Sequence, residues 1–452
     1  MAKSIVIIGN GISGITTARH IRKLDDTCRI TVISGETPHF FSRTALMYVY
    51  MGHLKFEHTK PYEDWFWAKN RIDLVQGWVT EFDFNQKKIA VSGQSNSVIG
   101  YDALVLALGS KPNFYNWPGQ DLRGVQGLYS KQDLDTMERD TVGVTHGVIV
   151  GGGLIGIEMA EMLRSRGIEV TFLVRESSFW NNVLPAQESA LINEHIAQHH
   201  VDLRLGSELA EILPDQNGRV GAVVTKNGEK IDCQFVGLTV GVSPNVSMFK
   251  NQSNALLGTL ETDRGILVDA FLQTNQPHVY AIGDCVQHRT PPPGRRAVEQ
   301  IWYTGRIMGE TLAQTLCGKP TAYQPGVFFN SAKFFDIEYQ TYGDLPAQLP
   351  AGCATFYWDK PGKNTAVRIN YDQASGAVLG MNAFGIRQRH EVWDGWIAQK
   401  KTIQHVLQHL PEANFDPEFF KQYEVEIIGQ FNAQTGSSLA VKSKKGLARM
   451  FS

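Results

Sequence analysis

The feature that most constrains the fold is a glycine-rich loop placed between an apolar strand and an amphipathic helix. Residues 3–8 have the pattern of a buried strand, a G-x-G-x-x-G loop occupies 9–14, and 15–24 have helical spacing before a second strand at 29–33. The glycines of such a loop allow a tight turn and close approach of a pyrophosphate to the backbone, and the helix N-terminus supplies positive potential. The predicted dinucleotide contacts are Gly9, Gly11, Ser13 and Gly14.

The same pattern returns later in the chain. A strand at 147–150 is followed by a second G-x-G-x-x-G loop at 151–156, a helix to about 166 and a strand at 169–174. A duplication that has lost one binding site is the alternative, but the second copy keeps all three glycines. The chain is therefore predicted to bind two dinucleotides, the second through Gly151, Gly153 and Gly156.

Charged residues after the second strand of each unit bear on which dinucleotide is bound. Glu36 is the nearest carboxylate after the first unit that can accept hydrogen bonds from ribose hydroxyls. In the second unit, Glu176 suits a free 2′-hydroxyl and Arg175 suits a 2′-phosphate, so NADH and NADPH both stay open. Repulsion between Glu176 and a 2′-phosphate favours NADH.

Length and composition limit the class of protein. The 452 residues suggest about three domains, and 43 basic against 45 acidic residues argue against a generic nucleic-acid binder. Five widely spaced cysteines without a C-x-x-C pair, and a strand that begins at Ile5 in place of a secretory leader, favour the cytoplasm. No apolar stretch approaches the roughly 20 residues of a membrane-spanning helix.

Further motifs resemble one family of flavoproteins. The sequence YDALVLALGS at 101–110, the stretch at 274–285 that ends in AIGDC, and GVSPN at 241–245 are similar to the pyridine nucleotide-disulphide oxidoreductase superfamily. EQIW at 299–302 resembles its ferredoxin-reductase and nitrite-reductase branch. The resemblance runs from Lys3 to about Gly343.

This resemblance implies an α/β fold with two Rossmann-like dinucleotide-binding domains and a C-terminal α+β domain. FAD would occupy the first loop, and NAD(P)H the second. The implied FAD domain is discontinuous, 1–118 and 250–320, because the NAD(P) domain at 119–249 is inserted into it. The C-terminal interface domain would span 321–430, followed by a basic tail at 431–452.

The resemblance also implies individual cofactor contacts. Asp284 would bind the ribityl hydroxyls, with a helix N-cap as the alternative, and Arg43 would approach the FAD pyrophosphate unless it is merely solvated. Trp302 would pack near the isoalloxazine or in the core, and Glu158 would lie near the nicotinamide or serve a helix dipole. The remaining implied cofactor contacts are Ala107, Gly109, Gly241 and Glu299. Where the family has Ala-Thr-Gly, this chain has Leu108 in the middle and lacks the hydroxyl.

The absence of sulfur at one place is informative. Disulphide-reducing branches need a thiolate beside the flavin, yet no cysteine occurs between Cys28 and Cys233, and Cys285 reads as a small packing residue. We therefore predict an FAD-dependent oxidoreductase that passes electrons from NAD(P)H to a ferredoxin- or rubredoxin-like protein. The alternatives are an NAD(P)H:quinone reductase at a membrane surface and a flavin-containing sensor or scaffold with little turnover.

The C-terminal region changes pattern to short, aromatic-rich strands, with helices expected at 389–400 and 403–409. No metal is predicted, because His199, His200, His405 and His409 lack carboxylate or cysteine partners at ligand spacing. The expected strands are 327–330, 337–342, 354–358, 366–371 and 377–381.

The final segment is basic and partly amphipathic. From Ile427 to Ser452 there is no acidic residue. A solvated terminus, an acidic protein partner and anionic lipid are the three interpretations. The resemblance permits a monomer or a homodimer. The residues that give the tail its character are Lys442, Lys444, Lys445, Leu447, Arg449, Met450 and Phe451.

Overall fold

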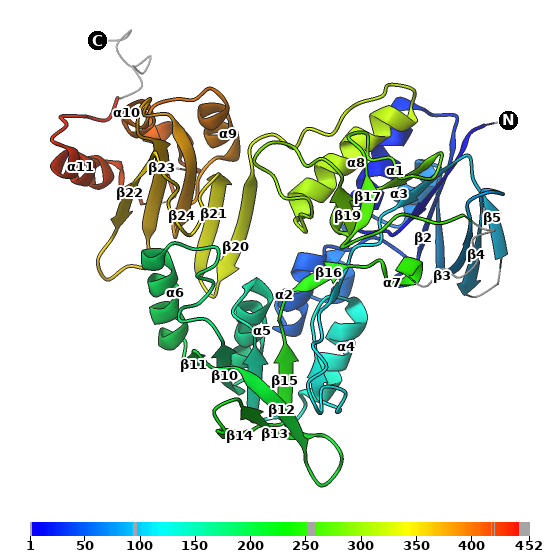
Figure 1. Cartoon of the computed structure of the whole chain (residues 1–452), viewed down its shortest axis with the longest axis horizontal. Coiled ribbons are helices and arrows are strands. Elements are labelled where there is room, and N and C mark those ends of the chain that lie inside the picture. The colour runs from blue at the N-terminus through cyan, green and yellow to red at the C-terminus, as the bar shows by residue number, and fades with distance from the viewer. Residues whose placement is uncertain (1, 94–96, 251–257, 417, 420, 443–452) are drawn as a thin grey trace. The chain divides into compact units, whose positions relative to one another are not determined.

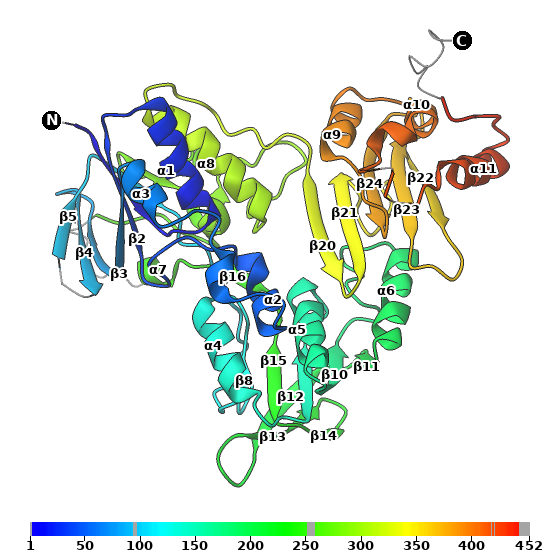
Figure 2. The ribbon, with the colours of Figure 1, turned by 180° about the vertical axis from the view of Figure 1, so that it is seen from behind.

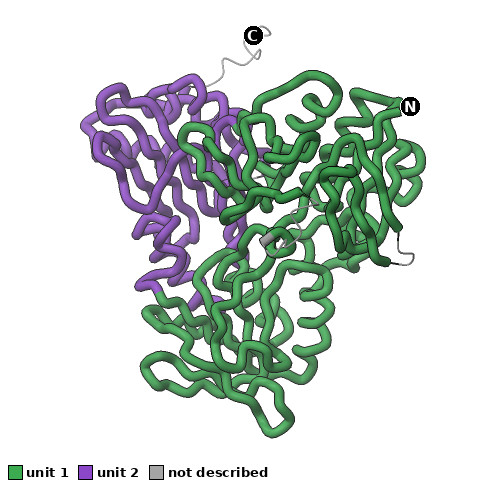
Figure 3. Tube along the Cα trace, turned by 45° about the vertical axis from the view of Figure 1, so that its right-hand side comes forward, with its two compact units in different colours: residues 1–175, 200–325 green, residues 176–199, 326–452 purple. Residues whose placement is uncertain are grey.

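The computed structural model describes residues 2–93, 97–250, 258–416, 418–419 and 421–442. The chain forms two compact units (Figure 3). Unit 1 comprises residues 1–175 and 200–325, and unit 2 comprises residues 176–199 and 326–452.

The first sheet of unit 1 has seven strands in the order β18-β6-β1-β2-β3-β4-β5. Strand β1 lies inside the sheet and pairs in parallel with β2 on one side and β6 on the other, and β4 and β5 add an antiparallel edge. The chain continues from β1 to β2 on one side and later returns to β6 on the other side of β1. The carboxyl end of β1 is therefore a topological switch point, the place where open α/β sheets bind ligands. The strands are β1 (Ser4–Ile8), β2 (Arg29–Ser34), β3 (Ile72–Asp83), β4 (Lys88–Gly93), β5 (Ser97–Gly100), β6 (Ala103–Leu106) and β18 (Val279–Ala281).

Helix α1 (Ile12–Leu24) and helix α8 (Trp302–Leu316) lie side by side against this sheet (Figures 1 and 2). Their close approach depends on glycines in α8. A Cβ added to Gly309 would lie 2.7 Å from the carbonyl oxygen of Ser13, and one added to Gly305 would lie 2.6 Å from the Ser13 Oγ. The short helices of this unit are α2 (Leu46–Tyr50), α3 (Trp65–Lys69) and α7 (Ser247–Lys250).

The second sheet of unit 1 is a five-stranded parallel sheet in the order β11-β10-β9-β15-β8. Helix α5 (Leu154–Ser165) follows the central strand β9, and α4 (Lys131–Asp140) precedes it. Its strands are β8 (Val125–Gln126), β9 (His146–Val150), β10 (Glu169–Val174), β11 (Val201–Leu205) and β15 (Phe235–Leu238). A smaller antiparallel sheet adds β12 (Leu209–Pro214), β13 (Val220–Thr225) and β14 (Lys230–Asp232), and two ladders pair β7 (Ser110–Pro112) with β16 (Val242–Pro244) and β17 (Ile266–Val268) with β19 (Val286–His288).

Unit 2 is built on an antiparallel sheet in the order β20-β21-β24-β23-β22, and all five predicted strands are present. Large aromatic side chains such as Trp393, Tyr342 and Phe356 are buried in its core. The elements are β20 (Phe329–Phe334), β21 (Ile337–Gly343), β22 (Cys353–Asp359), β23 (Ala366–Asp372), β24 (Val378–Phe384), α6 (Ala186–Gln198), α9 (His390–Ala398), α10 (Ile403–Gln408) and α11 (Glu424–Thr435).

Two segments differ from the expected organisation. Residues 176–199, which we expected within the NAD(P) domain, belong to unit 2, where the buried Glu188 pairs with Arg368 of β23 at 3.1 Å. Helix α11 continues to Thr435, past the expected start of the basic tail at 431, because its Phe431 is packed in the core of unit 2. The tail residues 443–452 lie outside the described residues. Across the described part of the chain, no helix combines the length and apolarity needed to cross a membrane.

Candidate dinucleotide sites

The first glycine-rich loop leaves β1 and enters α1. Gly9 has a φ of +109°, and an added Cβ there would collide with the carbonyl oxygen of Ala107. A Cβ on Gly14 would collide with the carbonyl oxygen of Gly9, so the protein itself requires both outer glycines. Gly11 lies at the N-cap of α1, which has no side-chain cap, and apart from its chain neighbours no atom of the described residues lies within 4 Å of its Cβ position. An open face at a helix N-terminus is chemically suited to a pyrophosphate, and the predicted role of Gly11 stays a prediction.

The second loop, between β9 and α5, repeats this division. Gly151 has a φ of +115°, and its Cβ would lie 2.6 Å from the carbonyl oxygen of Thr239. A Cβ on Gly156 would lie 2.5 Å from the carbonyl oxygen of Gly151, whereas none of the described atoms lies within 4 Å of the Cβ position of Gly153. The two loops therefore follow the same pattern: the first and last glycines have no room for a side chain, and the middle glycine has room for one.

Glu36 and Arg43 lie together after β2. The guanidinium of Arg43 donates to both carboxylate oxygens of Glu36, at 2.8 and 2.6 Å, and the backbone N–H of Lys131 also donates to Glu36 at 2.9 Å. Arg43 donates further to the carbonyl oxygen of Tyr129 at 2.5 Å. The alternative of a merely solvated arginine is thus wrong, because bidentate pairing fixes the position of the guanidinium.

Asp284 lies in a 3₁₀ turn at 283–285 that runs into β19. The next α-helix of the described chain begins only at Trp302, so the alternative of a helix N-cap is wrong. The Oγ of Ser110 donates to Asp284 Oδ2 at 3.2 Å, and the hydroxyl of Tyr129 lies 3.5 Å from the same oxygen. Burial raises the pKa of Asp284, with the hydrogen bond from Ser110 acting in the opposite direction.

Tyr129 is a functional candidate that sequence reasoning missed. Its hydroxyl accepts the backbone N–H of Ser110 at 2.9 Å, and its ring lies 4.5 Å from the Arg43 guanidinium. Burial raises its pKa to about 12, so the phenol stays protonated and can donate. The residue precedes α4 in an irregular segment, where no sequence period marks it. Tyr129 connects the Glu36 and Arg43 pair with the group around Asp284.

A cavity of about 1020 Å³ borders this group. Gln300 lines the cavity and also donates to the Oγ of Ser110 at 2.5 Å, which continues the hydrogen bonds to Asp284. Lys111, Arg264 and Arg296 contribute cationic side chains to its wall. Ser110 and Gln300 lie in motifs that the sequence singled out, but only the tertiary structure shows that they contact each other.

The other predicted contacts are placed as follows. Ala107 meets the first loop through its carbonyl oxygen, Gly109 has a φ of +68°, and the carbonyl oxygen of Gly241 accepts from Asn113 at 3.1 Å. Glu299 forms a buried ion pair with Arg295 at 2.6 Å. The predicted cofactor contacts of these four residues stay predictions.

Two alternatives from the sequence are wrong. Trp302 begins α8 and is 37% exposed, so it is not a core tryptophan. Glu158 is the fifth residue of α5, whose first turn has no acidic residue, so the helix-dipole interpretation does not hold. Arg175 and Glu176 follow β10 directly, and the choice between NADH and NADPH stays a prediction.

The cysteines are free thiols. Cys285 is fully buried, and its Sγ lies 3.4 Å from the carbonyl oxygen of Leu106 and 3.3 Å from that of Ile282. Burial raises the pKa of Cys285 to about 12, so its reactive thiolate is strongly disfavoured. This environment agrees with a packing role.

One expectation about histidine is wrong. The sequence predicts that His199 lacks a carboxylate partner because none stands at ligand spacing, but its Nε2 lies 3.1 Å from Asp336 Oδ1 in unit 2. His405 and His409 stack on each other with ring centroids 4.1 Å apart.

The comparisons with known proteins agree with this fold. The family model for pyridine nucleotide-disulphide oxidoreductases matches residues 3–302, and the chain belongs to that family. It is 26% identical over 381 residues to nitrite reductase [NAD(P)H] of Bacillus subtilis, covering 83% of this chain and 45% of that protein. It is 27% identical over 429 residues to rhodocoxin reductase of Rhodococcus erythropolis, covering 92% and 93% of the two chains.

Among solved structures, a ferredoxin reductase of Rhodopseudomonas palustris superposes with a TM-score of 0.77 at 23% identity, covering 95% of this chain and 99% of that one. This likeness shows the fold. The chain spans about half the length of two of the curated relatives that it matches. Family membership agrees with the paired glycine loops.

Proposed function

We propose that this chain passes electrons from NAD(P)H through FAD to a ferredoxin- or rubredoxin-like protein. The observation that carries the proposal is the pair of loops in which Gly11 and Gly153 leave an open face at a helix N-terminus. Relatives named rhodocoxin reductase, rubredoxin-NAD(+) reductase and ferredoxin--NAD(P)(+) reductase support a protein acceptor.

The residues of unit 1 would bind and orient the flavin. Gly11 would admit the pyrophosphate, and Asp284 would accept hydrogen bonds from the ribityl hydroxyls, held in place by Ser110 and Tyr129. When bound, FAD supplies a centre that takes a hydride from a nicotinamide and releases electrons singly. Gly153 would admit the pyrophosphate of the nicotinamide dinucleotide, for which we propose NADH on account of Glu176.

The acceptor that we propose is not a disulphide. A disulphide reductase needs an accessible thiolate near the flavin, whereas Cys285, which follows Asp284, is buried with its pKa raised to about 12. The quinone reductase alternative depended on membrane contact through the tail, whose residues 443–452 lie outside the described part of the chain. A cytoplasmic location and the oligomeric state stay predictions.

The test is anaerobic reduction of the purified holoprotein by NADH or NADPH, followed by oxidation with ferredoxin, rubredoxin, a water-soluble quinone or glutathione disulphide. We expect rapid bleaching of the flavin by NADH and reoxidation by one of the two redox proteins. Fast turnover with quinone alone would favour the quinone alternative, and reduction without any turnover would favour the sensor.

A matched variant separates the two dinucleotide sites. Gly153→Val should retain FAD and lose reduction by NAD(P)H, because its side chain fills the open middle of the second loop only. Reduction at an unchanged rate in this variant would contradict the assignment of the second loop.

A further inference from the structure

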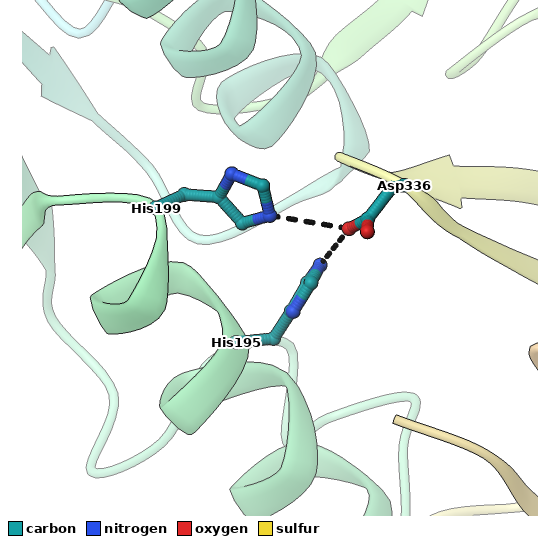
Figure 4. Close-up of side chains that lie close together, drawn as sticks. All are labelled: His195, His199 and Asp336. Carbon is teal, nitrogen blue, oxygen red and sulfur yellow. Dashed lines mark hydrogen bonds and ion pairs between the residues drawn. The ribbon is translucent and has the colours of Figure 1, made fainter. Parts of the chain in front are cut away.

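Unit 2 contains a cluster of two imidazoles and one carboxylate that the proposed function does not use. His195 Nε2 lies 2.7 Å, and His199 Nε2 lies 3.1 Å, from the same oxygen of Asp336 (Figure 4). One ligand atom from each of the three residues lies within 4.8 Å of the other two. The cluster joins two segments that are far apart in the sequence.

The backbone of each segment presents these side chains in one direction. His195 and His199 are four residues apart at the C-terminal end of α6, so they project from the same face of the helix. Asp336 lies in the two-residue turn between β20 and β21, where Phe334 pairs with Ile337. Phe335 in that turn has a φ of +54°, which is uncommon for a bulky residue.

Neighbouring side chains fix the two imidazole rings. The ring of Phe335 stacks on that of His199, with centroids 4.2 Å apart and planes at 5°. Asn364 lies 2.8 Å from the Nδ1 of His195. The side-chain amide of Asn364, turned over, would accept the Nδ1–H and leave the Nε2 lone pair free for a metal, as outer-shell partners of histidine ligands do.

The contact with Asp336 does not give the Nε2 of His195 a hydrogen bond. His195 is 1% exposed, and its buried Nε2 has no hydrogen-bond partner of acceptable geometry despite the short separation from the carboxylate. A buried nitrogen in this state is costly. A cation between the three groups would satisfy it.

We propose that His195, His199 and Asp336 bind a zinc ion. Two imidazole nitrogens and a carboxylate oxygen are a donor set that Zn²⁺ uses, with ligand distances of about 2.0–2.2 Å. Tetrahedral geometry at those distances places donors about 3.4 Å apart, so the observed separations from Asp336 need to widen by less than about 1 Å. The side chain of Asp336 is 75% exposed, which gives the ion a path from solvent and leaves a fourth position for water.

The bound ion would tie α6 to the β20–β21 turn within unit 2. We propose a structural role, because the proposed electron transfer uses none of the three residues. Zinc binding and electron transfer can therefore succeed or fail independently in the tests.

The experiment uses full-length holoprotein treated with EDTA and then titrated with Zn²⁺ in competition with a chromophoric chelator. We expect one equivalent to bind to the unaltered protein, and Co²⁺ as a substitute to give the intense visible absorption of a tetrahedral site. Asp336→Asn and His199→Gln should each weaken the binding more than about 100-fold, which exceeds the loss typical of outer-shell changes. Asp336→Asn alters an exposed side chain and should fold normally.

Two control variants retain the three ligands. His200→Asn removes the adjacent exposed imidazole, and Asn suits the backbone φ of +58° at this position. His409→Gln removes one ring of the stacked His405 and His409 pair at the end of α10. Both should bind Zn²⁺ as the unaltered protein does. Hydrogen exchange of α6 and of the β20–β21 turn should slow on adding Zn²⁺, and reduction of the flavin by NADH should keep its rate in Asp336→Asn. The proposal is overturned if the unaltered protein binds no zinc, or if Asp336→Asn and His199→Gln bind it undiminished.

Discussion

At the residue scale, the glycines of each loop serve different physical needs. The outer glycines, Gly9 and Gly14 in the first loop, are required because a Cβ would collide with carbonyl oxygens of the protein itself. At the middle glycine, Gly11, an added Cβ would meet no atom of the described residues beyond its chain neighbours. We therefore expect a side chain at Gly11 to weaken dinucleotide binding, and a side chain at Gly14 to lower the stability of the fold.

We expect Gly11→Val to fold with a melting temperature close to that of the unaltered apoprotein and to purify without flavin. Gly14→Val should lower the stability by more than about 2 kcal/mol, since backbone must move to admit the side chain. Flavin absorbance per chain and thermal unfolding of the apoproteins measure the two effects. Normal flavin content in Gly11→Val would contradict the assignment of FAD to this loop.

Cys285 illustrates how burial determines chemistry at a single residue. Because its thiol is enclosed and its pKa is raised to about 12, we expect Cys285→Ser to change FAD retention or stability modestly, by about 1–2 kcal/mol. Acceptor turnover should persist, and the two-electron-reduced protein should lack a long-wavelength thiolate-to-flavin band. A variant that keeps its flavin and its reduction by NAD(P)H yet loses all turnover would place sulfur on the electron path.

At the scale of elements, the contact between α1 and α8 depends on two small positions in α8. Gly305 and Gly309 are one helical turn apart, and both face Ser13 of α1. The first loop enters α1, so this contact also holds the N-terminus of α1 in place beside the sheet.

We expect Gly309→Val to destabilise unit 1 by about 1–3 kcal/mol and to weaken FAD binding, because the two helices must separate. Gly429→Ala is the matched control, since Gly429 lies in α11 and, beyond its own helix backbone and chain neighbours, no atom of the described residues lies within 4 Å of its Cβ position. Higher helix propensity should make the control more stable by up to about 1 kcal/mol. Chemical unfolding and flavin release on heating give both results, and equal effects of the two substitutions would refute the packing argument.

At the scale of the whole molecule, a buried polar group attaches residues 176–199 to the C-terminal sheet. Glu188 of α6 is fully buried and accepts from Arg368 at 3.1 Å and from Asn382 at 3.0 Å. Burial raises the pKa of Glu188 to about 7, against the opposing effect of Arg368. This shift connects the stability of unit 2 with pH.

Between pH 4.5 and 7, the folded state holds a proton on Glu188 that the unfolded state has released. The free energy of unfolding should therefore fall as the pH rises through this window, by up to about 1.4 kcal/mol per pH unit. Glu188→Gln should flatten the slope, whereas Glu194→Gln, on an exposed residue of the same helix, should keep it. Urea unfolding at pH 5.5 and 7.5, followed by tryptophan fluorescence, measures the slopes, and an unchanged slope in Glu188→Gln would disprove the role of this carboxyl.

The sequence by itself determined the elements and the family. The strands and helices around both glycine loops, and the five aromatic-rich strands of unit 2, follow from local periodicity, which a sequence displays directly. The positions of Gly11 and Gly153 were equally readable, because the glycine spacing reflects a backbone requirement confined to a few residues.

Only the tertiary structure decided which side chains meet. The place of α6 in unit 2, the contacts of Tyr129 with Arg43 and Asp284, and the meeting of His195 and His199 with Asp336 join residues more than 80 positions apart. Such contacts arise from packing of whole elements and leave no period in the chain. The sequence neighbours of His199 therefore offered no carboxylate at ligand spacing. The fold brings Asp336 to it from the turn between β20 and β21, which are far from His199 in the sequence.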